Sequence, residues 1–279
     1  MSQQTRIDEF WQYVVERHAI YERRLKGQLR PWTSDAILHK HRFCNVYRWL
    51  DPTSIALINV LRTKNSIDEV AFASMAFRLV TNRFWVLETY GLPERLIDKV
   101  EQWLEMLKID PRPTRLATHY NRSWQNVTIT LSDACNKPLT ADLPNTTLDL
   151  LKNVKGIGSF YGTQIIGDLI MEGRIGWPHD AHVRPGPGAR GGLYYLKTGE
   201  RLSIYGHKVI DGKRIAVPRA RFIEYSEDLK TINQSLFDAQ PPLPLGKLSY
   251  VDIEQNLCEF LKYLALKEGG SGRLYKKPA

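Results

Sequence analysis

Two apolar helical segments that meet at the motif Gly-Ile-Gly, residues 156–158, constrain the fold of this chain more than any other feature of its sequence. The first segment begins at Asn145 or Thr146, either of which is suited to cap a helix, and ends near Val154. The second opens at Ser159 and repeats apolar residues at helical spacing. Because glycine adopts backbone conformations that other residues avoid, the motif permits a tight reversal between the helices. The sequence therefore predicts a helical hairpin.

The remainder of the chain also has mainly helical periodicity. Residues 127–131 (VTITL) have the composition of a strand, although a helix could equally include them. Residues 185–217 are rich in glycine and turn residues, and the stretch 201–217 is typical of a β-hairpin that turns at Asp211-Gly212. Apolar spacing, capping residues and proline positions predict further helices over residues 7–25, 51–62, 66–79, 93–108, 218–238 and 249–266.

The composition is that of a folded, water-soluble protein, with 43% hydrophobic and 25% charged residues among 279. The longest apolar runs are too short to span a bilayer, and the first residues lack the apolar core of a signal peptide. We therefore expect a cytoplasmic protein without membrane association. Three widely separated cysteines (Cys44, Cys135 and Cys258) form no paired motif, so we expect neither a metal site nor a disulfide framework.

The charge of the chain is unbalanced, with 39 Lys and Arg against 30 Asp and Glu and a formal net charge of +9. This balance favours a polyanionic partner because contacts with phosphates release counterions, although a basic protein without such a partner is equally consistent with it. The amides expected at the start of the second hairpin helix lie at the positive end of its dipole and would form an anion site. On a basic protein, the phosphate of DNA is the obvious anion.

The hairpin sequence LKNVKGIGSFYG resembles the helix-hairpin-helix motif of the DNA glycosylase superfamily, with an ordinary helical hairpin as the alternative. The lysine nucleophile of bifunctional relatives is absent from the start of the second helix, and no four-cysteine cluster motif is present. We therefore expect no lyase activity and no cofactor, although a monovalent cation at the hairpin is compatible with the motif. The residues expected to bind the DNA backbone are Lys155, Gly156, Ile157, Gly158, Ser159 and Arg184.

The sequence HDAHVR, residues 179–184, follows the hairpin and is similar to the catalytic motif of the same superfamily. By this resemblance Asp180, which lies 22 residues after Gly158, is the catalytic carboxylate. A buried carboxylate can stabilise oxocarbenium-like charge and orient water for attack on C1′ of a nucleotide extruded from the duplex. An isolated aspartate is more often a cap or a solvated charge, but its position after the hairpin favours catalysis.

A second cluster of polar and aromatic residues lies between residues 24 and 51. Helical spacing would place Leu38, Arg42 and Asn45 on one face. Aromatic rings that sandwich a base, with Asn and Arg to read its edge, suit a pocket for a flipped nucleotide. A core helix with an internal Arg–Asp pair is the alternative. The residues assigned to the base pocket are Trp32, Asp35, Arg42, Phe43, Asn45, Arg48, His182 and Arg190.

Separated motifs extend a more specific resemblance over nearly the whole chain. RPWTSDAIL, RFCNVYR, GPGARGGL (186–193) and DIEQNLCEFLKY (252–263) look like the helical domain found with phage 5-hydroxymethyluracil DNA kinases. That domain belongs to a group of DNA-base hypermodification proteins that includes the glutamyl/putrescinyl-thymine pyrophosphorylases. GPGARGGL is expected to form a rigid turn beside which Arg190 could bind a phosphate or a base substituent. The chain has no Walker loop, so kinase activity is not expected.

These resemblances imply a mainly α fold of the helix-hairpin-helix DNA glycosylase type, with two helical lobes, a cleft between them and a small β-hairpin insertion. We expect residues 1–279 to form a single glycosylase-like unit, with lobes at 30–144 and 145–184 and with 1–29 and 185–279 flanking them.

The expected activity is hydrolysis of the N-glycosidic bond of a bulky modified pyrimidine, hydroxymethyl-derived or glycosylated as in phage DNA. A monomeric enzyme would act on double-stranded DNA and leave an abasic site, as in defence against phage. Two alternatives stay open. One is a transferase that replaces an activated 5-substituent of hydroxymethyluracil with an amine or amino acid, and the other is a non-catalytic module that binds modified DNA.

Overall fold

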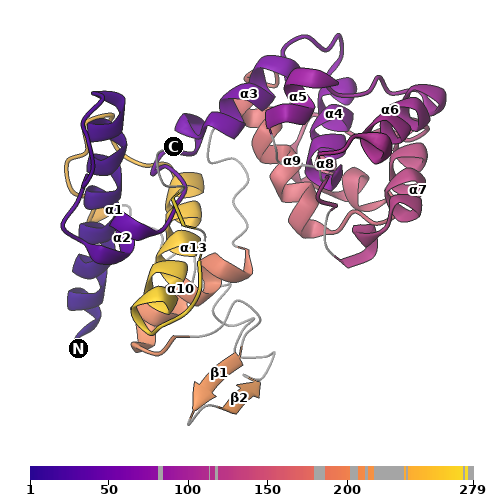
Figure 1. The fold of residues 1–279 in the computed structure, drawn as a ribbon. Helices are drawn as coiled ribbons and strands as arrows, with labels where there is room; N and C mark the ends of the chain where they lie inside the picture. The colour runs from indigo at the N-terminus through magenta and orange to yellow at the C-terminus, as the bar shows by residue number, and fades with distance from the viewer. Residues whose placement is uncertain are drawn as a thin grey trace. The chain divides into compact units, whose positions relative to one another are not determined.

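The chain forms two compact units in the computed structural model. Unit 1 comprises Met1–Leu50 and Pro185–Ala279, and unit 2 comprises Asp51–Arg184. Helices dominate the described part of both units, which confirms the predicted mainly α class (Figure 1). The residues that the structure describes are 1–80, 84–112, 114–116, 119–178, 186–201, 207–210, 213–216, 236, 238–272 and 274–275.

Two long helices of unit 1 confirm the helices predicted at the ends of the chain. The side-chain oxygen of Ser2 accepts a hydrogen bond from Thr5 N and caps the first. Ser249 and Asp252 form a reciprocal capping box at the start of the last. The elements of unit 1 are α1 (Gln3–Leu25), α2 (Ala36–Lys40), η1 (Arg48–Leu50), α10 (Pro187–Thr198), β1 (His207–Ile210), β2 (Lys213–Ala216) and α13 (Tyr250–Lys267).

In unit 1, α10 packs closely on α13, and glycine makes this approach possible. A Cβ on Gly192 would lie 2.6 Å from the backbone oxygen of Leu257, and one on Gly191 would lie 2.5 Å from Leu261 Cδ2. The predicted rigid turn at GPGARGGL is therefore wrong. Gly186 is the N-cap of α10, and Gly188, Gly191 and Gly192 lie within this helix because the packing against α13 outweighs their low helix propensity.

The two strands of the predicted β-hairpin are present in the structure. β1 and β2 pair antiparallel with His207 opposite Ala216 and Ile210 opposite Lys213. The register leaves two residues between the strands, as a turn at Asp211-Gly212 requires. Residues 211–212 themselves lie outside the described residues, as does most of the helix predicted over 218–238.

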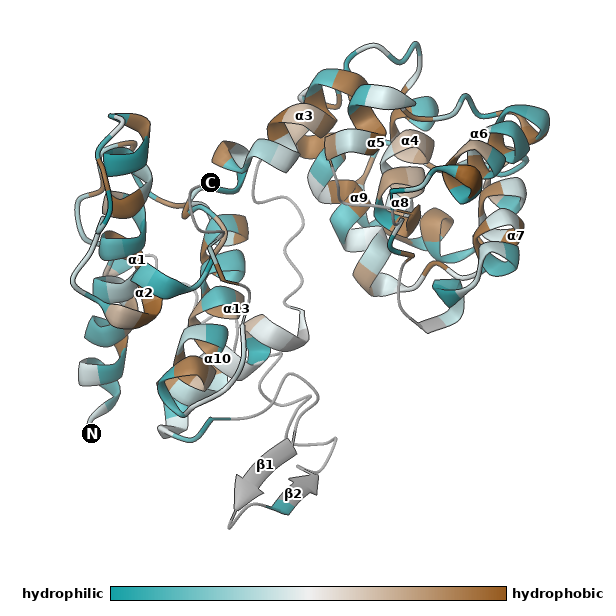
Figure 2. Ribbon diagram, viewed as in Figure 1, coloured by the Kyte–Doolittle hydropathy of each residue, from teal (hydrophilic) through white to brown (hydrophobic). Residues whose placement is uncertain are grey.

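Unit 2 is built around α4, whose buried residues run along almost its whole length. It packs against α3, α7 and α9. In Figure 2 hydrophobic residues gather where helices of the same unit face one another. The elements of unit 2 are α3 (Pro52–Leu61), α4 (Ile67–Val80), α5 (Phe84–Thr89), α6 (Ile97–Ile109), η2 (His119–Arg122), α7 (Trp124–Cys135), α8 (Pro144–Lys152) and α9 (Ser159–Glu172).

A buried carboxylate fixes α9 on α4. Asp168 is 0% exposed and accepts hydrogen bonds from Ser74 Oγ at 2.6 Å and Arg78 Nε at 2.9 Å. The second guanidinium nitrogen of Arg78 forms an ion pair with the other carboxylate oxygen. Removing Arg78 would leave the buried charge of Asp168 without compensation, so the pair favours one register of the two helices.

Several predicted boundaries in unit 2 differ from the structure. Residues 127–131 lie in α7, the helical alternative given for this stretch, because buried residues recur there at helical spacing (Val127, Thr130, Leu131 and Ala134). α6 begins at Ile97 instead of Pro93, and α8 has Pro144 in its first turn instead of a cap at 145 or 146. Ser66 and Glu69 do form the predicted start of α4.

The division into units also differs from the predicted lobes. α9 packs on α4, so residues 145–184 belong to the same unit as 51–144, and the boundaries lie after Leu50 and after Arg184. None of the described helices combines the length and apolar character needed to cross a membrane.

The glycine contacts of α10 lead to a stability prediction. Gly192→Ala is expected to lower the free energy of unfolding by about 1–3 kcal/mol, since its Cβ would meet backbone that cannot move aside. Gly191→Ala meets only the end of a flexible leucine and gains about 1 kcal/mol of helix propensity, so it should cost less. Chemical denaturation followed by circular dichroism measures both. Equal midpoints for the two variants would contradict this account of the packing.

Candidate nucleic-acid interface

The α8–α9 hairpin forms as the sequence predicts (Figure 1). The two helices approach closely at Gly162, where a Cβ would lie 2.5 Å from Leu148 Cδ1. Ile157 is buried in the core of unit 2, and its N–H donates to Val154 O at 3.0 Å. The connecting turn is therefore part of the core of unit 2, and its shape is set by packing.

Gly156 adopts a left-handed conformation, with φ of +83°. Its carbonyl oxygen accepts a hydrogen bond from Asn121 Nδ2 at 2.9 Å, and Thr130 Oγ1 donates to Asn121 Oδ1 at 2.8 Å. Asn121 and Thr130 are 1% and 0% exposed. A Cβ on Gly156 would lie 2.6 Å from Tyr120 Cδ1. Only glycine fits this turn, both for its φ and for the space beside it.

A network of charged groups also supports the turn. The backbone N–H of Lys155 donates to Asp133 Oδ2 at 2.8 Å. Lys137 Nζ donates to Asp133 Oδ2 at 2.7 Å and to Asn153 O at 2.6 Å. The hydrogen bonds from Lys137 and from Lys155 N lower the pKa of Asp133, so this carboxylate stays ionised. The side chain of Lys155 is left exposed at the turn.

The N-terminus of α9 opens to solvent at Gly158. This residue has φ of −102° and ψ of 179°, provides no side-chain cap, and has no atom near the position of a Cβ. The first helical hydrogen bond runs from Gly162 N to Gly158 O. Gly158, Ser159 and Phe160 are exposed. The positive end of the helix dipole thus faces solvent without a carboxylate or hydroxyl cap from Gly158, which is the geometry of an anion site.

The structure therefore brings together the predicted backbone-binding residues from Lys155 to Ser159, with Ile157 serving as the buried anchor. Asp180, His182 and Arg184 lie outside the described residues, so their assigned roles stay predictions. Pro178 is the last described residue after α9. The indole N–H of the preceding residue, Trp177, donates to Asp142 O at 2.9 Å.

The residues assigned to a base pocket between 32 and 48 lie in unit 1. The helical spacing assumed for Leu38, Arg42 and Asn45 is wrong, because α2 ends at Lys40. Asp35 caps α2 by accepting hydrogen bonds from the N–H groups of residues 37 and 38, and its second oxygen accepts one from Tyr263 OH at 2.6 Å.

Other assigned pocket residues have contacts within the fold. Phe43 and Asn45 are buried, and Asn45 Oδ1 accepts a hydrogen bond from the buried Arg17 at 3.0 Å. Arg48 is also buried, and its backbone N–H donates to Asp252 at 2.8 Å. These contacts lie within the fold of unit 1. Trp32 is partly exposed and Arg42 exposed.

Arg190 lies on α10, where burial lowers its pKa. At the start of the same helix Gly186 has no side-chain cap, and its N–H donates to Glu254 Oε1 at 2.8 Å. Burial raises the pKa of Glu254, while this hydrogen bond opposes the shift. The two family-like motifs GPGARGGL and DIEQNLCEFLKY therefore meet in the α10–α13 contact.

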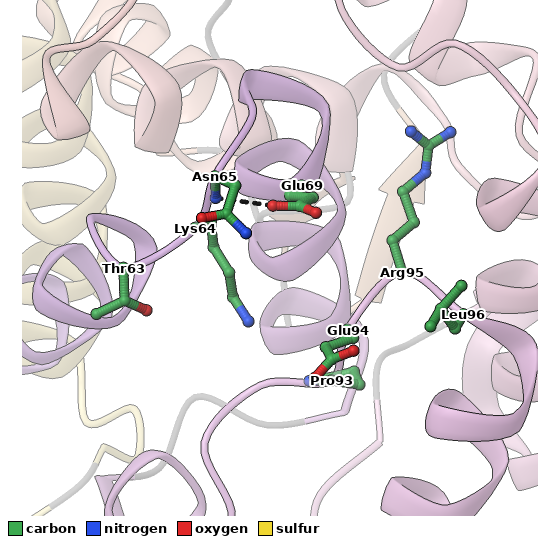
Figure 3. Close-up of a pocket in the computed structure, with 8 residues that line it drawn as sticks. All are labelled: Thr63, Lys64, Asn65, Glu69, Pro93, Glu94, Arg95 and Leu96. Atoms are coloured by element: carbon green, nitrogen blue, oxygen red, sulfur yellow. Dashed lines mark hydrogen bonds between the residues drawn. The ribbon is translucent and has the colours of Figure 1, made fainter.

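A surface pocket of about 450 Å³ in unit 2 contains none of the predicted site residues. Lys64 extends into it, and burial lowers the pKa of its ammonium (Figure 3). Asn65 N donates to Glu69 at 2.7 Å, and Arg95 turns away to pair with Asp68. Among the described residues no group of His, Cys, Asp and Glu could hold a metal ion. The pocket is lined by Thr63, Lys64, Asn65, Glu69, Pro93, Glu94, Arg95 and Leu96.

The support provided by Asn121, Thr130 and Asp133 was not predicted. These polar residues lie in or before an amphipathic helix, and nothing in their spacing connects them with a turn more than twenty residues away. One sign in the sequence is a polar residue, Thr130, on the otherwise apolar face of α7, which indicates a hydrogen-bond partner inside the fold.

A family model described as 5-hmdU DNA kinase, helical domain, matches residues 4–270 of the chain. The match spans both units and confirms the predicted resemblance to the kinase-associated helical domain. No curated protein and no solved structure matches the chain.

The geometry of the turn separates the roles of its two glycines. Gly156→Ala is expected to destabilise unit 2 by about 1–3 kcal/mol, since a non-glycine residue is strained at positive φ and its Cβ would meet Tyr120 and Thr130. Gly158→Asn should leave stability unchanged or raise it by a few tenths of a kcal/mol, because asparagine is a good N-cap and space is open there. Thermal denaturation compares the variants. Equal destabilisation at both positions would refute the assignment.

Proposed function

Since the chain belongs to the family of 5-hmdU DNA kinase helical domains, we propose that it binds DNA carrying a 5-hydroxymethyl-type pyrimidine through the α8–α9 hairpin. The observation that carries this proposal is the solvent-facing N-terminus of α9 at Gly158, held by a turn that packing has already fixed. A phosphate placed there accepts hydrogen bonds from backbone N–H groups and lies at the positive end of the dipole. The exposed Lys155 adds charge beside it.

The reaction proposed on this DNA is hydrolysis of the N-glycosidic bond of the modified base. Water attacks C1′, the C1′–N1 bond breaks, and the base leaves with the bonding electron pair and is protonated. Asp180 would accept the proton of the water and stabilise the positive charge that develops on the sugar. The sequence HDAHVR, which follows the hairpin in the chain, supports this assignment. The base must leave the stack to be reached, so modified pyrimidines that pair less stably are favoured substrates.

A second candidate function keeps the base in the polymer. The matching family is named for a DNA kinase, and phosphorylation of a 5-hydroxymethyl group would make it a leaving group. A chain that binds such DNA could then catalyse replacement of this group by an amine, or could only present the base to another enzyme. Cleavage at C1′ and substitution at the 5-substituent give different products, so one assay distinguishes these functions.

The product assay uses double-stranded DNA with 5-hydroxymethyluracil at one position. The full-length protein is expected to release the free base and leave an alkali-labile site. Asp180→Asn is expected to reduce release by at least about 10²–10³-fold, since it removes the group that stabilises the transition state, with DNA affinity little changed. Asp98→Asn, an exposed carboxylate of α6, is the control. Mass spectrometry of the released base and of the nucleosides in the strand makes the measurement.

Full release by Asp180→Asn would refute the catalytic assignment. A nucleoside of altered mass retained in the strand, with an amine supplied, would support transfer instead. Binding with neither product would support recognition alone.

The phosphate site has its own test at Gly158. Gly158→Asp is expected to weaken DNA binding, because its carboxylate would cap the amides of α9 and repel phosphate, while the same charge at a helix N-terminus raises stability by about 0.3–1 kcal/mol. Gly158→Asn caps without charge and should bind with intermediate affinity. Fluorescence anisotropy with two duplexes of unrelated sequence should give the same relative loss, since the contact is to the backbone. Unchanged affinity of Gly158→Asp would exclude the hairpin as the phosphate site.

A further inference from the structure

Two arginines and two aromatic residues of unit 1 form an arginine–aromatic cluster, defined here as Arg24, Arg30, Trp32 and Tyr275. The guanidinium carbon of Arg30 lies 4.7 Å from the ring centroid of Trp32 and 4.5 Å from that of Tyr275. That of Arg24 lies 5.3 Å and 5.9 Å from the same two centroids. The rings themselves meet edge to face at 5.7 Å. The four distances between a guanidinium carbon and a ring centroid are within the range of cation–π attraction.

Backbone hydrogen bonds hold the cluster in place. The indole N–H of Trp32 donates to Gln28 O at 2.7 Å. The backbone N–H of Tyr275 donates to Lys40 O at 3.1 Å, next to an antiparallel bridge between His41 and Leu274. The end of α1, the segment that follows it and the segment at Tyr275 are thus joined, so that both rings are positioned without a ligand.

The positive charge of the cluster is not balanced by carboxylates within the described part of the chain. The nearby Arg23 pairs with Glu16 at 3.0 Å. Arg24 and Arg30 have no ion pair with any residue that the structure describes. Arg24 is exposed and Arg30 partly exposed. Both guanidinium groups contact the same two rings, so the cluster carries two positive charges that a bound anion would balance.

We propose that the arginine–aromatic cluster binds the phosphodiester backbone of DNA as a second contact surface, separate from the hairpin of unit 2. A guanidinium that stacks on an aromatic ring keeps its N–H edge available, and this edge matches two oxygens of one phosphate. The rings hold the arginines in place, so less side-chain entropy is lost on binding. The identification of the polyanion as DNA rests on the proposed function.

The test compares the salt dependence of DNA binding for Arg24→Gln/Arg30→Gln with that of the wild-type chain. Each phosphate contact makes the negative slope of log K against log salt concentration steeper by about 0.9. The double variant, which loses two contacts, should therefore have a slope shallower by about 1.8. Arg24→Lys/Arg30→Lys keeps the charge but loses the stacked planar group, and should bind with intermediate affinity. Circular dichroism and thermal denaturation confirm that each variant is folded.

A matched control removes two charges from the same unit. Lys267 Nζ lies 2.7 Å from a carboxylate oxygen of Glu9, and Lys197 O accepts a hydrogen bond from Arg6, both near the N-terminal end of α1. At 1.5 Å per helical residue, Glu9 is roughly 22 Å from Arg24 along α1. Lys197→Gln/Lys267→Gln should therefore leave the slope near that of the wild type.

The outcomes separate this inference from the proposed function. If the wild-type chain binds DNA and Gly158→Asp weakens it, but the glutamine variant has the slope of the control, only the second surface is overturned. If lysine restores full binding, the stacked geometry is overturned. If the wild-type chain binds no DNA, both proposals fail.

Discussion

The side-chain amide of Asn121 holds the turn on which the candidate interface depends. Its nitrogen donates to Gly156 O, and its oxygen accepts from Thr130, so both ends of one buried amide are satisfied. A left-handed glycine would otherwise be among the least restrained positions of the chain. With the turn fixed from inside unit 2, the first amides of α9 are oriented before any anion arrives. Binding there does not have to order the backbone, which removes one of the main costs of association.

The hairpin could be predicted from sequence because its determinants are local. Helical periodicity on both sides and glycines between them lie within about thirty residues, and each acts through its own backbone preference. What holds the hairpin in place could not be predicted in the same way. Asn121 is 35 residues from Gly156, and the ion pair of Asp168 with Arg78 spans 90 residues. Such partners are selected by tertiary packing, and one sequence contains no signal of their pairing.

Unit 1 differs more from the prediction, because the same residue types there could serve either a binding site or the packing of the fold. Polar groups between 32 and 48 have the composition of a ligand pocket, yet Asp35 caps a short helix and Asn45 binds a buried arginine. The glycines of α10 have the composition of a turn, yet they allow a close helix contact. The cap formed by Asp35 is local, but the contacts of Asn45 with α1 and of the α10 glycines with α13 are long-range, and local propensity does not reveal them. The assignments of Asp180, His182 and Arg184 stay predictions.

The division of the chain has a consequence for how the protein is made. Unit 2 is one continuous stretch, whereas unit 1 joins the first fifty residues to everything after residue 184. A ribosome therefore completes all of unit 2 before it adds α13, whose Phe260 meets Phe10 of α1 at 5.4 Å between ring centroids. Until α10 and α13 have been made, α1 lacks the two helices that pack on it, so part of its apolar face stays exposed in the nascent chain. The second unit to be completed is the one that begins at the N-terminus.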